Sequence, residues 1–330
     1  MPTYEPDRWN DRESGGDVQD GNNCYDYAAD QPSDPKPGGC QPGRAGGNPL
    51  PEEGPITCDQ VMASAEADGF DCGQESGEPV TKDSNCPDGC WKVALVLQPA
   101  RDVEHTNDYH WYRQDDDGKW SHKPGAGEAT NEDNSGNEIT APETADRGIY
   151  TTFCGYCCVC PDRVEIASID PREGEAFATL TLKEPAVLTS RSMNLDLPAG
   201  RLSIIYGEKK PMSTQKPKVT VYVQIYSGRK NPQLNLSHEQ LEILRSKLVD
   251  LPGRETFPEV RLGYQGFLIH NPEKTRGIPL KVHVFDGAID VWDGKSRRLY
   301  EDVHQLEQWL IMLACSAPFG RNVKFVIEGA

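Results

Sequence analysis

Cysteine is concentrated in one half of the chain, and this constrains the fold more than any other feature. Ten of the eleven cysteines lie before residue 161, at positions 24, 40, 58, 72, 86, 90, 154, 157, 158 and 160, and the last is Cys315. Because the total is odd, at least one thiol stays unpaired if the others form disulfides. The first half is therefore expected to contain buried thiols, disulfides or a metal site.

Four of these cysteines have a spacing that resembles a zinc site. Cys86 and Cys90 form one close pair, and Cys154 and Cys157 form another far along the chain. Two such pairs are typical of four-cysteine zinc sites, but the first pair is spaced more loosely than zinc knuckles normally are. Burial or disulfide pairing is therefore preferred to zinc, and no other cofactor is predicted.

Charge divides the chain at about the same place as cysteine does. Residues 1–160 contain 31 Asp and Glu against 11 Lys and Arg, a balance of −20, whereas residues 161–330 contain 21 against 23, a balance of +2. This asymmetry predicts two units with different surfaces. The acidic first half argues against nucleic acid and anionic membranes as partners, and favours a neutral or cationic substrate.

The sequence also bears on where the protein is found. No run approaches the ~18 apolar residues that a membrane-spanning helix needs. The first residues, Met1 to Asp7, lack the basic and apolar parts of a signal peptide. We therefore expect a cytoplasmic protein, or one that a specialised system exports without a cleaved signal.

Cys24 is the strongest candidate for a chemically active residue. It follows the turn Gly21-Asn22-Asn23 and precedes residues that are able to begin a short helix. The unpaired N–H groups and positive dipole at a helix N-terminus stabilise a thiolate and lower the cysteine pKa. A nucleophilic cysteine also needs a histidine, which other parts of the chain have to supply.

A predicted β-hairpin supplies two histidines. Residues 109–114 alternate and place His110 on the same face as Tyr112; the turn at Asp117-Gly118 then leads to residues 119–123, which contain His122. The apolar residues 91–97 predict a central strand, and residues 150–159 a closing strand. A capping box at Thr57 and Gln60 predicts a helix between Cys24 and this sheet.

These residues resemble the papain-like cysteine hydrolases, in which a cysteine on a helix precedes a histidine on a strand. The stretch Asn23-Cys24-Tyr25-Asp26-Tyr27 is similar to the nucleophile turn of CHAP and NlpC-type amidases. His110 with the later Asp117-Gly118-Lys119-Trp120 is similar to the histidine hairpin of transglutaminase-like domains and papain-like toxin domains. The resemblance covers roughly residues 20–160.

The resemblance implies a role for each candidate residue. Cys24 would be the nucleophile and His110 the base, and Asn22 or Asn23 would help to stabilise an oxyanion. Family members usually have Asp or Asn on the strand after the histidine, where this chain has Ser121, His122 and Lys123. His122 is then the orienting residue or the base, and Asp133 or Asn134 of the following loop is the alternative orienting residue.

The second half has its own pattern of helices and strands. Alternation over residues 219–226, a capping box at Ser237 and Gln240, and strands at 266–269, 280–285 and 288–292 predict an α+β unit. A last helix is expected from about Asp302, followed by a strand at 323–327. No phosphate-binding loop, metal-ligand spacing or acid–base pair marks this unit with a function.

The predicted organisation is an ill-ordered segment at 1–20 and a papain-like α+β domain at 21–161. A linker with short strands follows at 162–217, and an α+β domain at 218–330. The first function predicted is a cysteine-dependent amide hydrolase or acyl transferase acting on a peptide or a peptidoglycan-like substrate, of the amidase, peptidase or toxin type. The alternative is an interaction protein without catalysis, in which an acidic, Cys-rich domain binds a partner protein.

Overall fold

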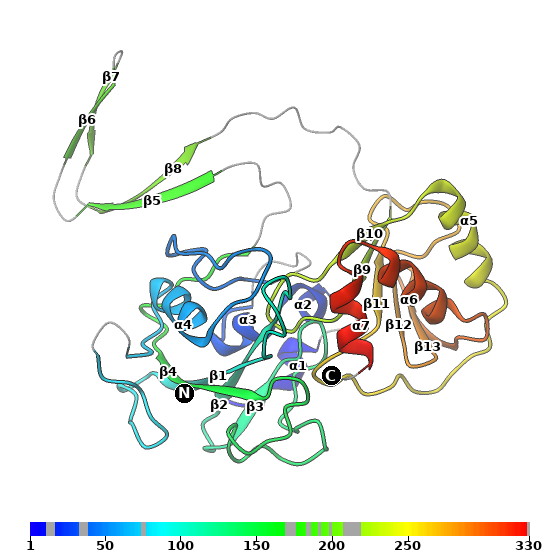
Figure 1. The fold of residues 1–330 in the computed structure, drawn as a ribbon, viewed down its shortest axis with the longest axis horizontal. Coiled ribbons are helices and arrows are strands. Elements are labelled where there is room, and N and C mark those ends of the chain that lie inside the picture. Colours follow the sequence, from blue (N-terminus) through cyan, green and yellow to red (C-terminus); the bar gives the residue numbers. More distant parts are fainter. Residues whose placement is uncertain are drawn as a thin grey trace.

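The computed structural model gives an α+β protein with two antiparallel sheets, one in each half of the chain (Figure 1). The residues that it describes are 1–10, 17–32, 39–73, 77–168, 176–182, 186–190, 193–197, 200–206 and 219–328.

The first half consists of short helices packed on a four-stranded sheet of order β3-β2-β1-β4. The helices are α1 (Pro6–Trp9), α2 (Asp17–Gly21), α3 (Cys24–Ala28) and α4 (Cys58–Ala67), and the strands are β1 (Trp91–Leu97), β2 (Tyr109–Gln114), β3 (Trp120–His122) and β4 (Thr152–Val159). All of β1 is buried, as expected of a central strand. The predicted hairpin, central strand and closing strand are confirmed.

Local hydrogen bonds explain where helices α3 and α4 begin. Asn23 caps α3 with its side chain and forms a capping box with Asp26. Thr57 and Gln60 form the predicted capping box at the start of α4. Each box satisfies backbone N–H groups that the first helical turn leaves free.

Four disulfides attach the loops of the first half to β4. The pairs are Cys58–Cys154, Cys72–Cys157, Cys86–Cys158 and Cys90–Cys160. The weaker zinc alternative for Cys86, Cys90, Cys154 and Cys157 is therefore excluded, because each of these sulfurs is bonded to another sulfur and is not a thiolate ligand; the preferred disulfide pairing is present. Cys24, Cys40 and Cys315 are not in disulfides.

The disulfides also bear on the compartment. Structural disulfides persist where the surroundings are oxidising and are rare in the reducing cytosol. They favour the exported alternative over the cytoplasmic one. Within the described residues, none of the helices has the length and apolar character needed to cross a membrane.

The second half forms a six-stranded antiparallel sheet of order β10-β9-β11-β12-β13-β14. Its elements are β9 (Thr220–Val223), β10 (Gln233–Asn235), α5 (His238–Lys247), β11 (Phe267–His270), β12 (Lys281–Phe285), β13 (Ala288–Trp292), β14 (Arg297–Glu301), α6 (Leu306–Ser316) and α7 (Gly320–Glu328). The strand expected at 323–327 is wrong, because this segment is helical in α7. Val323 and Val326, three residues apart, both lie in the core.

Two smaller sheets lie between the halves in sequence. β5 (Ala176–Leu182) pairs with β8 (Gly200–Tyr206), and β6 (Ala186–Ser190) pairs with β7 (Met193–Leu197). The short strands predicted for this linker include β5 and β8. The basic segment 209–218, expected to be an exposed linker, lies outside the described residues.

The two halves have separate cores but contact each other directly. α7 lies on the side of the second half that faces the first (Figure 1), where Phe325 packs edge-on against His105 and Arg321 pairs with Glu104. Leu262 of the second half packs into a cluster of the first half that includes Tyr150. Independent folding of the two halves stays a prediction.

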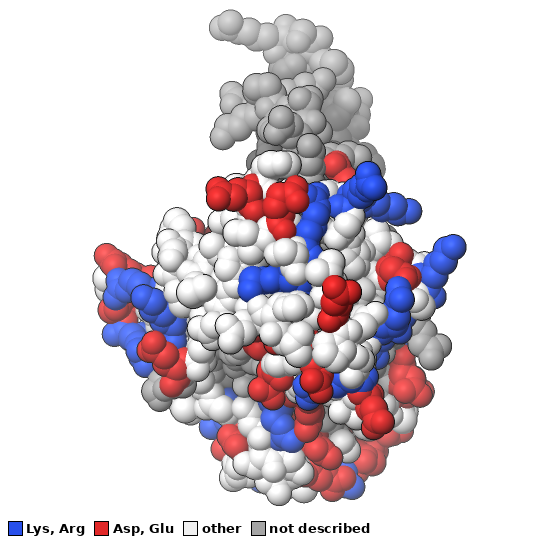
Figure 2. Space-filling model, turned by 90° about the vertical axis from the view of Figure 1, so that its right-hand side faces the viewer, with Lys and Arg blue, Asp and Glu red and all other residues white. Residues whose placement is uncertain are grey.

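The charges of the second half are mixed in space as well as in sequence. Figure 2 shows basic and acidic side chains interspersed over the face that this half presents. The pattern agrees with the nearly neutral balance of residues 161–330.

The described N-terminal residues are ordered by the first half, where the sequence predicted an ill-ordered segment. Trp9 is 1% exposed and packs edge-on against Tyr27 of α3. The Thr3 carbonyl accepts a hydrogen bond from the buried Arg113. One aromatic residue and a few backbone contacts are thus enough to attach these polar residues to the domain.

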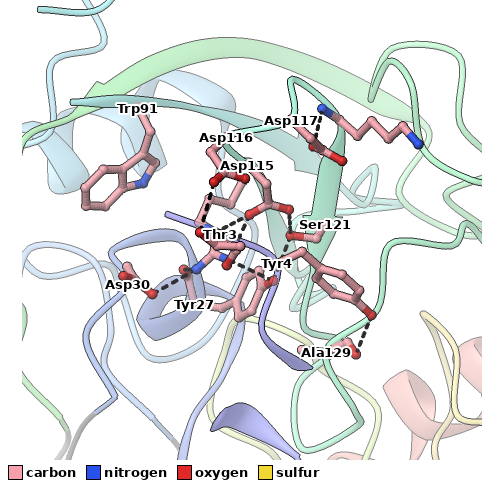
Figure 3. Close-up of polar contacts among 12 residues, drawn as sticks. Thr3, Tyr4, Tyr27, Asp30, Trp91, Asp115, Asp116, Asp117, Ser121 and Ala129 are labelled. Atoms are coloured by element: carbon pink, nitrogen blue, oxygen red, sulfur yellow. Dashed lines mark hydrogen bonds and ion pairs between the residues drawn. The ribbon is translucent and has the colours of Figure 1, made fainter. Parts of the chain in front are cut away.

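Arg113 is the centre of a buried polar network that joins α3 to the sheet. Figure 3 shows its partners Tyr27, Asp30 and Asp115. Its side chain, 1% exposed, forms ion pairs with Asp30 at 2.9 Å and with Asp115 at 2.8 Å. The guanidinium lies over the ring of Tyr27, and Ser121 donates to Asp115 at 2.5 Å. The network therefore sets the position of α3, which begins at Cys24, relative to β2, which contains His110.

Candidate functional site

Cys24 is the first residue of α3 and is fully buried against the sheet. Burial is the main influence on this thiol, and the backbone of Trp111 on β2 and the hydroxyl of Ser227 in the second half oppose it by favouring the thiolate. Burial raises the pKa of Cys24 well above its ordinary value, and the charge of Asp108 adds to this. The lowered pKa expected from the helix N-terminus is therefore wrong for this state, because loss of hydration outweighs the helix dipole.

His110 lies on β2 and has a partner on each ring nitrogen. Nδ1 is 2.6 Å from Ser227 Oγ, and Nε2 is 2.8 Å from His122 Nδ1 on the neighbouring strand β3. His122 Nε2 in turn lies 2.9 Å from the carbonyl oxygen of Glu132. The predicted pairing of His110 with His122 is thus present, and Ser227 of the second half engages the other ring nitrogen of His110.

Ser227, His110, His122 and the Glu132 carbonyl form a row of hydrogen-bonded groups. The carbonyl determines where the protons lie along this row. A carbonyl only accepts, so His122 Nε2 carries the proton and, in a neutral ring, His122 Nδ1 accepts from His110 Nε2. His110 Nδ1 is then unprotonated and accepts from the Ser227 hydroxyl. The Ser227 oxygen in turn accepts from the backbone N–H of Gly125 at 3.1 Å, so the basic nitrogen of His110 is engaged by Ser227.

Burial keeps both histidines neutral. It lowers the pKa of His110 well below its ordinary value, and the adjacent His122 lowers it further. Burial also lowers the pKa of His122 to about 4, although the Glu132 carbonyl and Asp133 oppose the shift. The Cys24 thiol and the imidazoles of His110 and His122 are therefore all neutral in this state.

These pKa values predict an acid-sensitive fold. With a pKa of about 4 in the folded protein and ~6.5 unfolded, His122 binds a proton only in the unfolded state between these limits. Its contribution to stability, about 3 kcal/mol, is present above pH ~6.5 and is lost as the pH falls toward ~4. Chemical denaturation at pH 7, 6, 5 and 4 measures this slope.

His122→Asn provides the test and His238→Gln its control. The first variant should have a smaller pH slope than wild type, and the second should keep the wild-type slope, because the His238 side chain is 90% exposed. Equal slopes in wild type and His122→Asn would contradict a neutral, buried His122.

Asp108, next to the histidine strand, holds a loop of the second half. Its buried carboxylate accepts hydrogen bonds from the backbone N–H groups of Ser227 at 2.5 Å, Gly228 at 3.2 Å and Arg229 at 2.8 Å. The Tyr150 hydroxyl donates to the same carboxylate at 2.6 Å. Asp108 was not among the predicted site residues, although it precedes the histidine strand by one residue.

Three donors of the first half converge on one carbonyl oxygen of this loop. The Gly228 carbonyl accepts from Asn23 Nδ2 at 3.1 Å and Gln41 Nε2 at 2.7 Å, and the Tyr109 hydroxyl lies 2.9 Å away. Asn23, the predicted oxyanion donor, thus donates here to the Gly228 carbonyl and also to the Cys40 carbonyl at 2.8 Å. Gln41 and Tyr109 were not predicted, and no motif in the sequence identifies them.

Two predicted residues lie outside this arrangement. Asn22 donates from Nδ2 to the Val18 carbonyl at 2.7 Å, so this donor is directed within its own turn. Asn134 pairs through both ends of its amide with the backbone of Leu262. Asn134 therefore joins the two halves and does not orient His110, and His122 takes that position.

Potential metal ligands are not clustered at the site in the part of the chain that the structure describes. No group of three or more His, Cys, Asp or Glu residues with metal-binding geometry occurs among the described residues. The three successive carboxylates Asp115, Asp116 and Asp117 do not form such a group, and the Asp115 carboxylate binds Arg113.

Comparison with known proteins identifies a relative but no characterised site. The chain is 36% identical over 158 residues to "Insoluble matrix shell protein 1" of Ruditapes philippinarum, covering 48% of this chain and 90% of the relative. The chain therefore belongs to the same family as that shell protein. No family model and no solved structure matches the chain.

Proposed function

We propose that the first half is a cysteine-dependent amide hydrolase or acyl transferase with a papain-like arrangement. The observation that supports this most strongly is the His110–His122 pair, in which the unprotonated Nδ1 of His110 is directed at Ser227, a residue whose hydroxyl also acts on the Cys24 thiol. A helix N-terminus supplies the cysteine, and two neighbouring antiparallel strands supply the histidines. General-base catalysis needs such a base near the nucleophile.

The proposed reaction uses Cys24 as the nucleophile and His110 first as the base and then as the acid. His110 Nδ1 takes the thiol proton, and the Cys24 sulfur attacks the carbonyl carbon of an amide. His110 then gives the proton to the leaving amine as the C–N bond breaks, which leaves a thioester on Cys24. Water completes hydrolysis, or a second amine completes acyl transfer, and His122 keeps the His110 ring in the required tautomer.

The amide groups near Cys24 suit the charge that this reaction develops. Asn23 Nδ2 and Gln41 Nε2 both point to one oxygen position, occupied here by the Gly228 carbonyl. Preorganised donors of this kind stabilise the oxyanion of a tetrahedral intermediate. A peptide or peptidoglycan-like amide is the proposed substrate class, and a neutral or cationic one suits the acidic first half.

The family relationship supports a second candidate, a binding protein without catalysis. The relative is named as an insoluble matrix protein of shell, and the four disulfides of this chain suit an extracellular matrix. In that case Cys24, His110 and His122 would belong to a buried polar core, and the protein would act by binding a partner.

Cys24→Ala separates the two candidates. If Cys24 is the nucleophile, hydrolysis of fluorescein-labelled casein and of purified peptidoglycan should fall to background without loss of folding. Cys40→Ala is the matched control, because Cys40 is also buried and not in a disulfide, and it should keep the wild-type rate. Full activity in a folded Cys24→Ala protein would exclude the proposed mechanism.

A further inference from the structure

A loop of the second half fills the place where a substrate of the proposed enzyme would bind. This loop, residues 226–231, connects β9 to β10 and is here called the plug segment. Ser227 is 1% exposed and Arg229 is 6% exposed. The space left between the plug segment and the turn before Cys24 is a cavity of only about 30 Å³, lined by Asn22, Asn23 and Ser227 among others.

The first half binds the plug segment through its backbone, as a peptide site does. Three successive N–H groups of the plug segment point to the Asp108 carboxylate, and the Gly228 carbonyl receives two amide donors and faces a tyrosine hydroxyl. These contacts satisfy both donors and acceptors of a short peptide. Backbone recognition of this kind fixes the position of a chain, and side-chain pockets add specificity.

The middle position of the plug segment has room only for glycine. A Cβ added to Gly228 would lie 2.3 Å from a ring carbon of Tyr109, which is fully buried. The contact is far inside van der Waals distance, and a buried ring has little freedom to move away. A peptide in this position therefore needs glycine next to the residue that faces Cys24.

The following position accepts a cation. The Arg229 guanidinium donates to the carbonyls of Pro51, Gly54 and Asn107. Beyond it lies a cavity of about 490 Å³, whose lining includes the acidic residues Glu52, Glu53 and Glu104 together with the basic residues Arg44 and Lys230; Arg44 pairs with Glu52 at 3.8 Å. Carbonyl oxygens followed by carboxylates suit a peptide that is basic after its glycine.

We propose that the surface around Cys24 is a binding site for peptides of the pattern Ser-Gly-Arg, and that the plug segment occupies this site in the resting protein. The inference rests on the proposed function, because it identifies the substrate class of the same site. The plug segment itself persists as a resident ligand, since its Ser227 hydroxyl binds His110 Nδ1 at 2.6 Å and so occupies the proposed base. Displacement of the plug segment by a peptide in trans would expose Cys24.

Gly228→Ala in the full chain tests the proposal, with Gly253→Ala as the matched control. A Cβ at Gly228 meets the Tyr109 ring, whereas a Cβ at Gly253 has no atom within 4 Å. Alkylation of Cys24 by iodoacetamide, followed by mass spectrometry, should be about 10- to 100-fold faster in Gly228→Ala, the size expected when a buried contact is overpacked. It should be unchanged in Gly253→Ala.

A synthetic peptide with the sequence of residues 226–231 completes the test. Added to Gly228→Ala, it should slow the alkylation of Cys24 again, and the same peptide with alanine in place of glycine should not. A folded Gly228→Ala protein whose Cys24 stays as slow as in wild type would overturn the proposal, and so would a failure of the peptide to protect. If Gly228→Ala does not fold, Arg229→Ala removes contacts without adding volume and should also speed alkylation; an unchanged rate there overturns the proposal.

Turnover separates this inference from the proposed function. If the peptide protects Cys24 but casein is not hydrolysed in any variant, the peptide site stands and the catalytic proposal fails. If casein is hydrolysed at the same rate in wild type and Gly228→Ala, the catalytic proposal stands and the resident plug segment is excluded.

Discussion

His110→Ala should lose a factor of ~10² to 10⁴ in amide turnover, the usual cost of removing a general acid–base. The substitution removes His110 Nδ1, which lies 2.6 Å from Ser227 Oγ and is the base in the proposed reaction. The measurement is the rate of fluorescein release from labelled casein, in wild type or, if the plug segment blocks access, in the Gly228→Ala background.

His122 provides the comparison. His122→Ala should lose less than His110→Ala, and His122→Asn should recover much of that loss, because an amide oxygen also accepts from His110 Nε2. This recovery would show that His122 acts by positioning His110, since a merely structural role would not depend on an acceptor. A larger loss at His122 than at His110 would exchange their roles while keeping the class of mechanism.

Arg113→Met should lower the free energy of unfolding by about 3–5 kcal/mol, as expected when one partner of a buried ion pair is removed. Methionine fills much of the volume, but it leaves the carboxylate of Asp115, itself 2% exposed, without its 2.8 Å partner. Urea denaturation at pH 7 with the disulfides intact measures the loss.

Arg8→Met is the matched control, because Arg8 and Arg113 both bind Oδ1 of Asp30 at 2.9 Å. The Arg8 side chain is 42% exposed, and such pairs contribute about 0–1 kcal/mol. Similar losses in the two variants would mean that burial does not set the strength of this network. Since the network joins α3 to β2, Arg113→Met should also slow any turnover that depends on Cys24 and His110.

The plug segment connects the two candidate functions. A matrix protein that keeps a reactive thiol covered until a peptide displaces its own loop would combine binding with chemistry at one site. The peptide-protection experiment and the casein assay address these two parts separately.

The sequence by itself determined the elements whose signals are local. The capping boxes at Thr57 and Ser237, the apolar strand 91–97 and the turn at Asp117-Gly118 depend on residues a few positions apart, and each lies where it was predicted. The pairing of His110 with His122 belongs to this group, because the tight hairpin brings the two strands together. β14 was missed, since Arg297–Glu301 is a polar edge strand without clear alternation.

Only the tertiary structure decided which distant residues meet. The disulfide partners are separated by 70 to 96 residues, and Ser227 lies 117 residues after His110, so no spacing in the sequence predicts either contact. The protonation state of Cys24 belongs here too: its helix N-terminus favours a thiolate, whereas burial beneath the second half favours the thiol. Burial depends on how the whole molecule packs. The loss of hydration on packing raises the pKa of Cys24 more than the helix dipole, which local sequence predicts, lowers it.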